Sequence, residues 1–146
     1  MTAVAFHFNA PDKRAYACRL LRKAFLKGAR LVVLAGAGRD VGLAQALWTL
    51  SPTDFVPHCR ESDSHQTQSR SPIFIAGAAL PADFQADVLL NLTDAVAVGY
   101  DRFARVIEVV EQDEGDRTRA RQRWRQYQAD GVTPERHDLK APGSAG

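Results

Sequence analysis

The chain has 146 residues, enough for one domain of about 100 to 200 residues but not for several. Hydrophobic residues make up 45% of it and charged residues 25%. This is close to the globular average, so it excludes a disordered chain, a fibrous repeat and a disulfide scaffold. Nineteen Lys and Arg stand against seventeen Asp and Glu, so any electrostatic function depends on where charges are placed, not on the net charge of +2.

The first half of the chain alternates between strand and helix patterns. Apolar residues at every second position predict a strand over 4–8, and a helical period follows over 12–27. Residues 31–35, LVVLA, form the continuous apolar run that is typical of a strand covered on both faces. A glycine-rich turn then leads into a second predicted helix, over 41–50.

The second half continues the alternation. Three short apolar runs predict strands at 73–75, 87–92 and 106–110. The polar stretch 59–71 is expected to be a mobile surface loop, and a last helix is expected from Asp116, as its N-cap, to Asp130.

These elements together predict an α/β fold. We expect a single Rossmann-like domain over 1–131, with a mostly parallel, mixed sheet that is flanked by helices on both faces. Residues 132–146 are small, polar and Pro-containing, so a flexible C-terminal tail is expected there.

Two cysteines, Cys18 and Cys59, are too few to indicate a disulfide framework. The first residues lack the apolar core of a signal peptide, and no window approaches 18 consecutive apolar residues. We therefore expect a cytoplasmic protein that is neither exported nor membrane-spanning.

Gly36, Gly38 and Gly42 follow an apolar strand and open a helix, where a phosphate-binding loop would lie. Their spacing is one residue too long for the dinucleotide fingerprint, and no GxxxxGK[ST] motif occurs. An ordinary strand-to-helix turn is therefore favoured over a nucleotide-dependent enzyme, and no cofactor is expected.

His58, Cys59 and His65 lie close together in the chain, but a structural zinc site needs four ligands, and no CxxC or HxxxH pair is present. No metal is expected. The sequence also lacks a GxSxG elbow or another catalytic constellation, so no catalytic residue is predicted.

Two apolar faces run along the second predicted helix, one of which carries Trp48. Either the helix is deeply buried in its own domain, or Trp48 belongs with Phe55 and Pro57 to a patch that meets another protein. The sequence leaves both interpretations open.

The last helix carries five arginines within nine residues: Arg117, Arg119, Arg121, Arg123 and Arg125. Helical spacing places Arg117, Arg121, Trp124 and Arg125 on one face with Gln128. Guanidinium groups around an aromatic ring suit single-stranded nucleic acid or an acidic peptide end whose carboxylate an arginine can grip. The alternative is a solvated arginine face without a ligand.

The chain resembles the chi subunit family of bacterial DNA polymerase III holoenzyme. The resemblance is carried by residues 46–58, ALWTLSPTDFVPH, by the strand 87–92, by Phe103 with 106–110, and by the arginine-rich helix up to Gly131. It implies an α/β accessory subunit of a DNA-directed DNA polymerase complex, a nucleotidyltransferase, with no catalytic site of its own.

Two partners are implied by the resemblance. The psi subunit would tie the chain to the clamp loader, with Trp48, Phe55 and Pro57 in the neighbourhood of its binding surface. The single-stranded-DNA-binding protein would dock its acidic C-terminal tail, which ends in a Pro-Phe carboxylate. Any contact with DNA would then be indirect; direct binding of single-stranded nucleic acid by the arginine-rich helix is the alternative.

By position, the residues that match the family's tail-binding site are Val110, Arg117, Arg121, Trp124 and Arg125. Arginine stands at 117 and 125 where lysine can occur, and Trp124 stands where tyrosine can, so charge and aromatic surface are kept. The tail carboxylate is expected at Arg121, its Phe ring between Val110 and Trp124, and its upstream acidic residues at Arg117 and Arg125.

Overall fold

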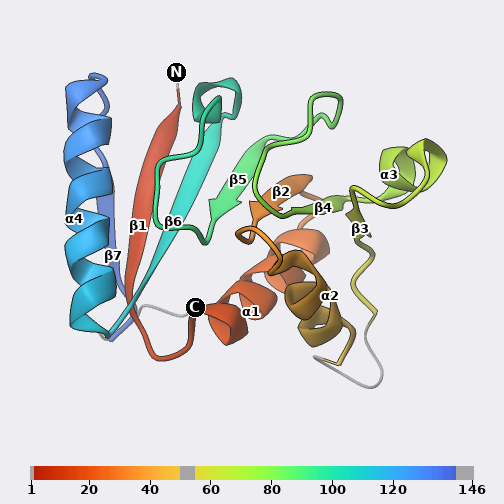
Figure 1. Ribbon diagram of the computed structural model, residues 1–146, viewed down its shortest axis with the longest axis horizontal. Helices are drawn as coiled ribbons and strands as arrows, with labels where there is room; N and C mark the ends of the chain where they lie inside the picture. Colours follow the sequence, from red (N-terminus) through yellow and green to blue (C-terminus); the bar gives the residue numbers. More distant parts are fainter. Residues whose placement is uncertain (1, 50–54, 141–146) are drawn as a thin grey trace.

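The computed structural model describes residues 2–49 and 55–140, which form one sheet with helices on both sides (Figure 1). The strands are β1 (Ala3–Ala10), β2 (Leu31–Leu34), β3 (Cys59–Arg60), β4 (Ile73–Ala76), β5 (Val88–Asn91), β6 (Arg105–Glu111) and β7 (Glu135–Asp138). The helices are α1 (Lys13–Leu26), α2 (Asp40–Trp48), α3 (His65–Arg70) and α4 (Glu114–Ala129), with a 3-10 turn at Tyr100–Arg102.

The strand order is β3-β4-β2-β5-β6-β1-β7, and every neighbouring pair is parallel. The α/β prediction is thus confirmed, and the sheet of the described residues is wholly parallel. Parallel strands require crossover connections, which α1, α2 and α4 supply.

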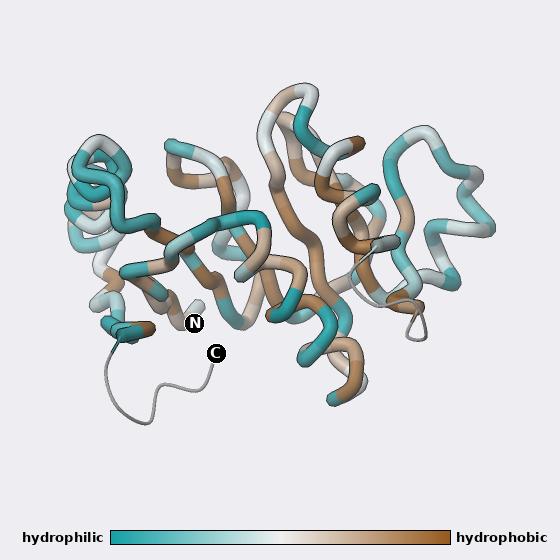
Figure 2. Tube along the Cα trace, turned by 90° about the horizontal axis from the view of Figure 1, so that it is seen from below, coloured by the Kyte–Doolittle hydropathy of each residue, from teal (hydrophilic) through white to brown (hydrophobic). Residues whose placement is uncertain are grey.

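Two apolar clusters cover the two faces of the sheet. One packs α1 and α2 against alternate residues of the central strands, and the other packs α4 against the opposite face. In Figure 2 the central strands are largely hydrophobic, whereas α4, at the left of both views, is mostly hydrophilic. Helix α4 therefore turns a narrow apolar stripe to the sheet and a wide polar surface to solvent.

Local signals explain where α1 begins and ends. The Asp12 side chain caps its start by accepting a hydrogen bond from the Ala15 backbone N–H at 3.0 Å. Gly28 follows the last turn with φ +79°, a left-handed conformation that L side chains rarely adopt. Helix α2 begins at Asp40 and ends at Trp48; the predicted end at Leu50 lies outside the described residues.

The prediction of a mobile loop over 59–71 is wrong, because β3 and α3 lie within this stretch. Ser64 caps α3 by accepting a hydrogen bond from the Thr67 backbone N–H at 3.2 Å. The Gln68 amide donates to the carbonyls of Arg60, Glu61 and Asp63. Side-chain hydrogen bonds thus organise a segment that has little apolar surface to bury.

The tail prediction also differs from the structure. Residues 135–138 form β7, which pairs in parallel with residues 5–8 of β1 at the edge of the sheet. The Asn9 amide donates to Asp138 Oδ1 at 2.8 Å and fastens the end of this strand. Residues 141–146, also in the predicted tail, lie outside the described residues.

Helix α4 begins three residues earlier than predicted, with Asp113 as its N-cap instead of Asp116. The Asp113 side chain accepts a hydrogen bond from the Asp116 backbone N–H at 2.9 Å. Asp116 itself turns inward, where it accepts from the Glu111 backbone N–H at 2.8 Å and pairs with Lys13 at 3.2 Å. These bonds draw the start of α4 towards the end of β6.

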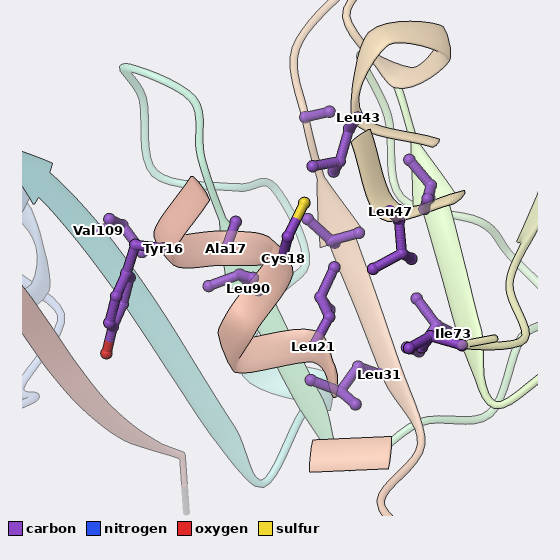
Figure 3. Close-up of a cluster of buried hydrophobic side chains, with 14 of the residues drawn as sticks. Tyr16, Ala17, Cys18, Leu21, Leu31, Leu43, Leu47, Ile73, Leu90 and Val109 are labelled. Atoms are coloured by element: carbon purple, nitrogen blue, oxygen red, sulfur yellow. The ribbon is translucent and has the colours of Figure 1, made fainter. Parts of the chain in front are cut away.

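Leu21 lies at the centre of the cluster beneath α1, surrounded by side chains of α2 and the central strands (Figure 3). It is fully buried, whereas Leu26 on the same helix is 65% exposed. We predict that Leu21→Ala lowers the free energy of unfolding by about 3 kcal/mol, because it leaves a cavity. Leu26→Ala should change it by less than about 0.5 kcal/mol. Urea denaturation checks both, and equal effects would contradict this placement of the core.

Candidate functional site: a cleft between helix α4 and the sheet edge

A cleft of about 650 Å³ opens between α4 and the strands β6, β1 and β7. Its lining consists of Phe6, Phe8, Asn9, Val110, Arg117, Ala120, Arg121, Trp124 and Arg136. The structure therefore brings together Val110, Arg117, Arg121 and Trp124 of the sequence-predicted site. Arg125 is exposed on α4 but is not among the lining residues.

The floor of the cleft is apolar. Val110 and Ala120 are buried, and the rings of Phe6 and Trp124 lie 5.1 Å apart, tilted by 51°. Phe8 extends the apolar surface along β1, two residues beyond Phe6 on the same face of the strand. Such a floor can hold an aromatic or aliphatic side chain of a ligand.

Cationic side chains form one rim. Arg117 Nη2 donates to Asn9 Oδ1 at 3.0 Å, which holds its guanidinium over the end of β1. Arg117 and Arg121 both lie near Glu114, at 3.7 and 3.5 Å. More than half of the Arg121 side chain is exposed, so this pair is weak and the guanidinium can exchange Glu114 for a ligand carboxylate.

Arg136 reaches the cleft from β7 and was missed by sequence reasoning, which expected a flexible tail there. The register pairs Phe6 with Arg136, so both side chains leave the same face of the sheet. The Cζ atom of Arg136 lies over the Phe8 ring, 5.0 Å from its centroid, in a cation–π contact. Residues 135–138 are all polar or charged, so they lack the apolar alternation that predicts a strand.

The remaining two arginines of α4 point away from the cleft. Arg119 Nε lies 3.2 Å from Asp94 Oδ1, and its Nη2 lies 3.6 Å from Asp116. Arg123 is buried and pairs with Glu108 of β6, with Nε 2.9 Å from Oε1. The five arginines therefore do not form one positive field, because acidic residues neutralise these two.

Glu108 is the centre of a buried polar network. Besides Arg123, it accepts hydrogen bonds from the Tyr127 hydroxyl at 2.6 Å and the Asn91 amide at 3.0 Å. Burial raises the pKa of Glu108, while the Arg123 charge and these hydrogen bonds oppose the rise. Burial and the adjacent carboxylate raise the pKa of Tyr127. Both Arg123 and Tyr127 belong to α4, so the network holds this helix on β6.

We predict that Arg123→Met lowers the free energy of unfolding by about 3 to 5 kcal/mol, because it leaves Glu108 as an uncompensated buried charge. The double variant Glu108→Gln/Arg123→Met should be less destabilised than Arg123→Met, since it leaves no unpaired charge buried. Arg119→Met, which removes an exposed pair, should cost less than about 1 kcal/mol. Thermal and urea unfolding provide the comparison; a double variant as unstable as the sum of its single changes would contradict the coupling.

A second set of contacts joins β7 to β1 on the opposite face of the sheet. His7 and His137 are paired in register, with ring centroids 4.7 Å apart, and His7 Nδ1 lies 2.5 Å from the Tyr16 hydroxyl. Burial, with the nearby His137, Arg105 and Lys23, lowers the pKa of His7 to about 4. His7 is therefore neutral at pH 7.

This lowered pKa predicts a pH dependence. The unfolded chain protonates His7 near pH 6.5 but the folded chain only near pH 4, so stability decreases as the pH falls through this window. We expect a loss of about 1 to 2 kcal/mol from His7, less than the full shift implies because solvent screens part of the effect. Urea unfolding of wild type and His7→Gln at pH 7.5 and 4.5 checks this. Identical pH profiles would contradict it.

The residues that sequence analysis grouped as a protein-binding patch lie at one end of α2. Trp48 and Phe55 are 63% and 54% exposed, and their rings lie 4.7 Å apart. The His58 ring contacts both, and Pro57 beside it is partly buried. Trp48 is thus not buried in its own domain, and two exposed aromatic rings in contact at the surface are typical of a protein-protein contact.

The glycine turn does not offer an anion site. Gly36 and Gly38 have φ of +109° and +73°, as a strand-to-helix turn requires. The carboxylate of Asp40 lies in the first turn of α2 and pairs with Arg60 at 2.9 Å. The hydrogen bond from Arg60, with bonds from the helix N-terminus, holds the pKa of Asp40 below its usual value. The negative charge of Asp40 would repel a phosphate at this turn.

Among the residues that the structure describes, His58, Cys59 and His65 do not gather into a metal-binding group, and no other group of three His, Cys, Asp or Glu does. Burial raises the pKa of the Cys59 thiol to about 11, so it is protonated at pH 7. Within 2–49 and 55–140, no helix has the length and apolarity needed to cross a membrane.

The comparisons with known proteins decide the family. The family model for the DNA polymerase III chi subunit, HolC, matches residues 1–135. The chain belongs to the DNA polymerase III chi subunit family. It is 26% identical over 116 residues to the DNA polymerase III subunit chi of Haemophilus influenzae, covering 79% of each chain. It is 28% identical over 124 residues to that of Pseudomonas aeruginosa, covering 84% of each.

Membership in the chi family makes this chain an accessory subunit of DNA polymerase III that functions in DNA replication. The family assignment confirms the resemblance identified from residues 46–58 and the arginine-rich helix.

Proposed function

We propose that this chi subunit is a non-catalytic bridge between the clamp loader, through psi, and the acidic C-terminal tail of the single-stranded-DNA-binding protein. The observation that carries the proposal is the cleft on α4, where an apolar floor is combined with exposed guanidinium groups. A peptide that ends in an aromatic residue with a free carboxylate has matching chemistry. Its work at the replication fork would be cytoplasmic and would need neither a cofactor nor a metal.

The bound tail is arranged by the cleft residues. The terminal carboxylate pairs with Arg121, whose side chain is 58% exposed, against 39% for Arg117, the other α4 arginine in the lining. The Phe ring enters the apolar floor beside Val110 and Trp124. Arg117, held by Asn9, meets an upstream acidic residue, and Arg125 offers a further contact along α4.

Direct binding of single-stranded nucleic acid is the competing function of the same helix. It would need a continuous positive track and an open aromatic face for stacking. Arg119 and Arg123 are paired with acidic residues, and Trp124 packs against Phe6. These contacts leave a short cationic rim beside a pocket, which favours a peptide end.

The psi interface is proposed at Trp48, Phe55 and Pro57. The exposed pair of tilted aromatic rings has the apolar surface that a helix or strand of a protein partner would cover. This patch belongs to α2 and the segment before β3, far along the sheet order from β7 and the tail cleft.

We predict that Arg121→Ala weakens binding of an acidic peptide ending in Pro-Phe by about 30-fold to 150-fold. This corresponds to about 2 to 3 kcal/mol, the range for a lost charge-assisted hydrogen bond. Fluorescence anisotropy with a labelled peptide measures it. Amidation of the peptide terminus should have a similar effect on wild type and little further effect on Arg121→Ala, because both changes remove the same ion pair.

Arg117→Gln serves as the second variant of this series. Its effect should be larger at low salt than at high salt, because it removes a partly exposed charge and not the anchor. An unlabelled oligonucleotide of thymidine should not displace the peptide. If wild type does not bind the peptide but binds the oligonucleotide, the nucleic-acid function replaces this proposal.

A further inference from the structure

We infer that β7 completes the tail-binding cleft, and that Arg136, more than Arg125, contacts the acidic residues upstream of the terminal Pro-Phe. The inference rests on the proposed function and deepens it, because it gives the path that the bound peptide takes. Arg136 lies one residue beyond residues 1–135, the part of the chain that the family model matches.

The strand register fixes where Arg136 points. Phe6 pairs with Arg136 and Phe8 with Asp138, so these four side chains share the face of the sheet that α4 covers. His137, between them, points to the other face and contacts His7. The β7 backbone therefore presents Arg136 to the cleft across the β1 floor from α4.

The Arg136 guanidinium is held in place but remains available. Its Cζ atom lies over the Phe8 ring in a cation–π contact, and the residue is exposed. Stacking on an aromatic ring leaves the N–H groups at the edge of the guanidinium free to bind a carboxylate. A stacked arginine also loses less side-chain entropy on binding than a free one.

The acidic residues near the cleft leave this position cationic. Glu114 lies between Arg117 and Arg121 and lowers their joint charge. Asp138 is on the same face as Arg136 and interacts with it electrostatically, but its Oδ1 is directed towards the Asn9 amide and the Lys140 backbone N–H, from which it accepts hydrogen bonds. Across the apolar floor from α4, Arg136 is thus the cation best placed to bind a second acidic residue of the peptide.

Arg125 is the alternative contact. It follows Arg121 by one turn of α4, about 6 Å along the helix axis, and is not part of the cleft lining. A peptide that reaches Arg125 runs along the helix, whereas one that reaches Arg136 crosses the β1 floor towards the sheet edge. The second path keeps the peptide over Phe6 and Phe8, where it buries apolar surface.

A double-mutant cycle between protein and peptide tests the path. One labelled peptide carries three Asp residues before Ala-Pro-Phe, and the other carries three Ser residues instead. Anisotropy titrations at low salt compare wild type, Arg136→Gln, Arg125→Gln and Arg121→Ala. Lys140→Gln, which removes an exposed charge outside the cleft lining, is the matched control, and thermal unfolding verifies that each variant is folded.

We expect Arg136→Gln to weaken binding of the Asp peptide about three-fold to five-fold, as for a surface charge pair, and to leave the affinity for the Ser peptide unchanged. Arg125→Gln and Lys140→Gln should change either affinity by less than two-fold. Arg121→Ala should weaken binding of both peptides, because it removes the partner of the terminal carboxylate that both share.

A weaker affinity for the Asp peptide in Arg125→Gln but not in Arg136→Gln would overturn this inference while leaving the proposed function intact. An equal decrease in affinity for both peptides in Arg136→Gln would also overturn it, since the effect would then come from the shape of β7 and not from charge. Wild type that binds neither peptide would overturn the proposed function, and this inference with it.

Discussion

The buried carboxylate of Glu108 is the contact on which the geometry of the cleft depends. It lies on β6, next to β1 in the sheet, and binds two side chains of α4, Arg123 and Tyr127, one turn apart. A purely apolar contact would allow the helix to slide or rotate, because hydrophobic packing is not directional. Directed bonds from two successive turns fix both the rotation and the height of α4, and so fix which of its residues face the cleft.

The rotation of α4 explains why its five arginines have different surroundings. Arginines at every second position alternate between two sides of a helix, since two residues turn it by about 200°. Once Arg123 is fixed inward, Arg117, Arg121 and Arg125 must lie on another side, and Arg119 falls near Asp94 and Asp116. Charge pairing on one side of α4 leaves the opposite side cationic, without a large net charge on the protein.

Elements with an apolar run or a clear helical period were predictable from sequence, and short polar ones were not. The apolar runs that became β2 and β6, and the arginine spacing that placed Arg121 and Trp124 on one face, carry strong local signals. β7 and α3 do not, because their stability comes from partners distant in sequence or from side-chain hydrogen bonds. Arg136 was therefore missed, although it lies in the same cleft.

The bridge that we propose requires both of its proposed sites to be accessible at once. Trp48 lies on α2, which covers one face of the sheet beside β4, whereas the cleft lies on the other face beside β1 and β7 (Figure 1). Several parallel strands separate them in the sheet order. Partners at the two sites would not compete for the same surface, and a pull on one would be carried to the other by backbone hydrogen bonds across the sheet. In the described residues, the parallel sheet therefore joins the two proposed sites through one continuous set of backbone hydrogen bonds.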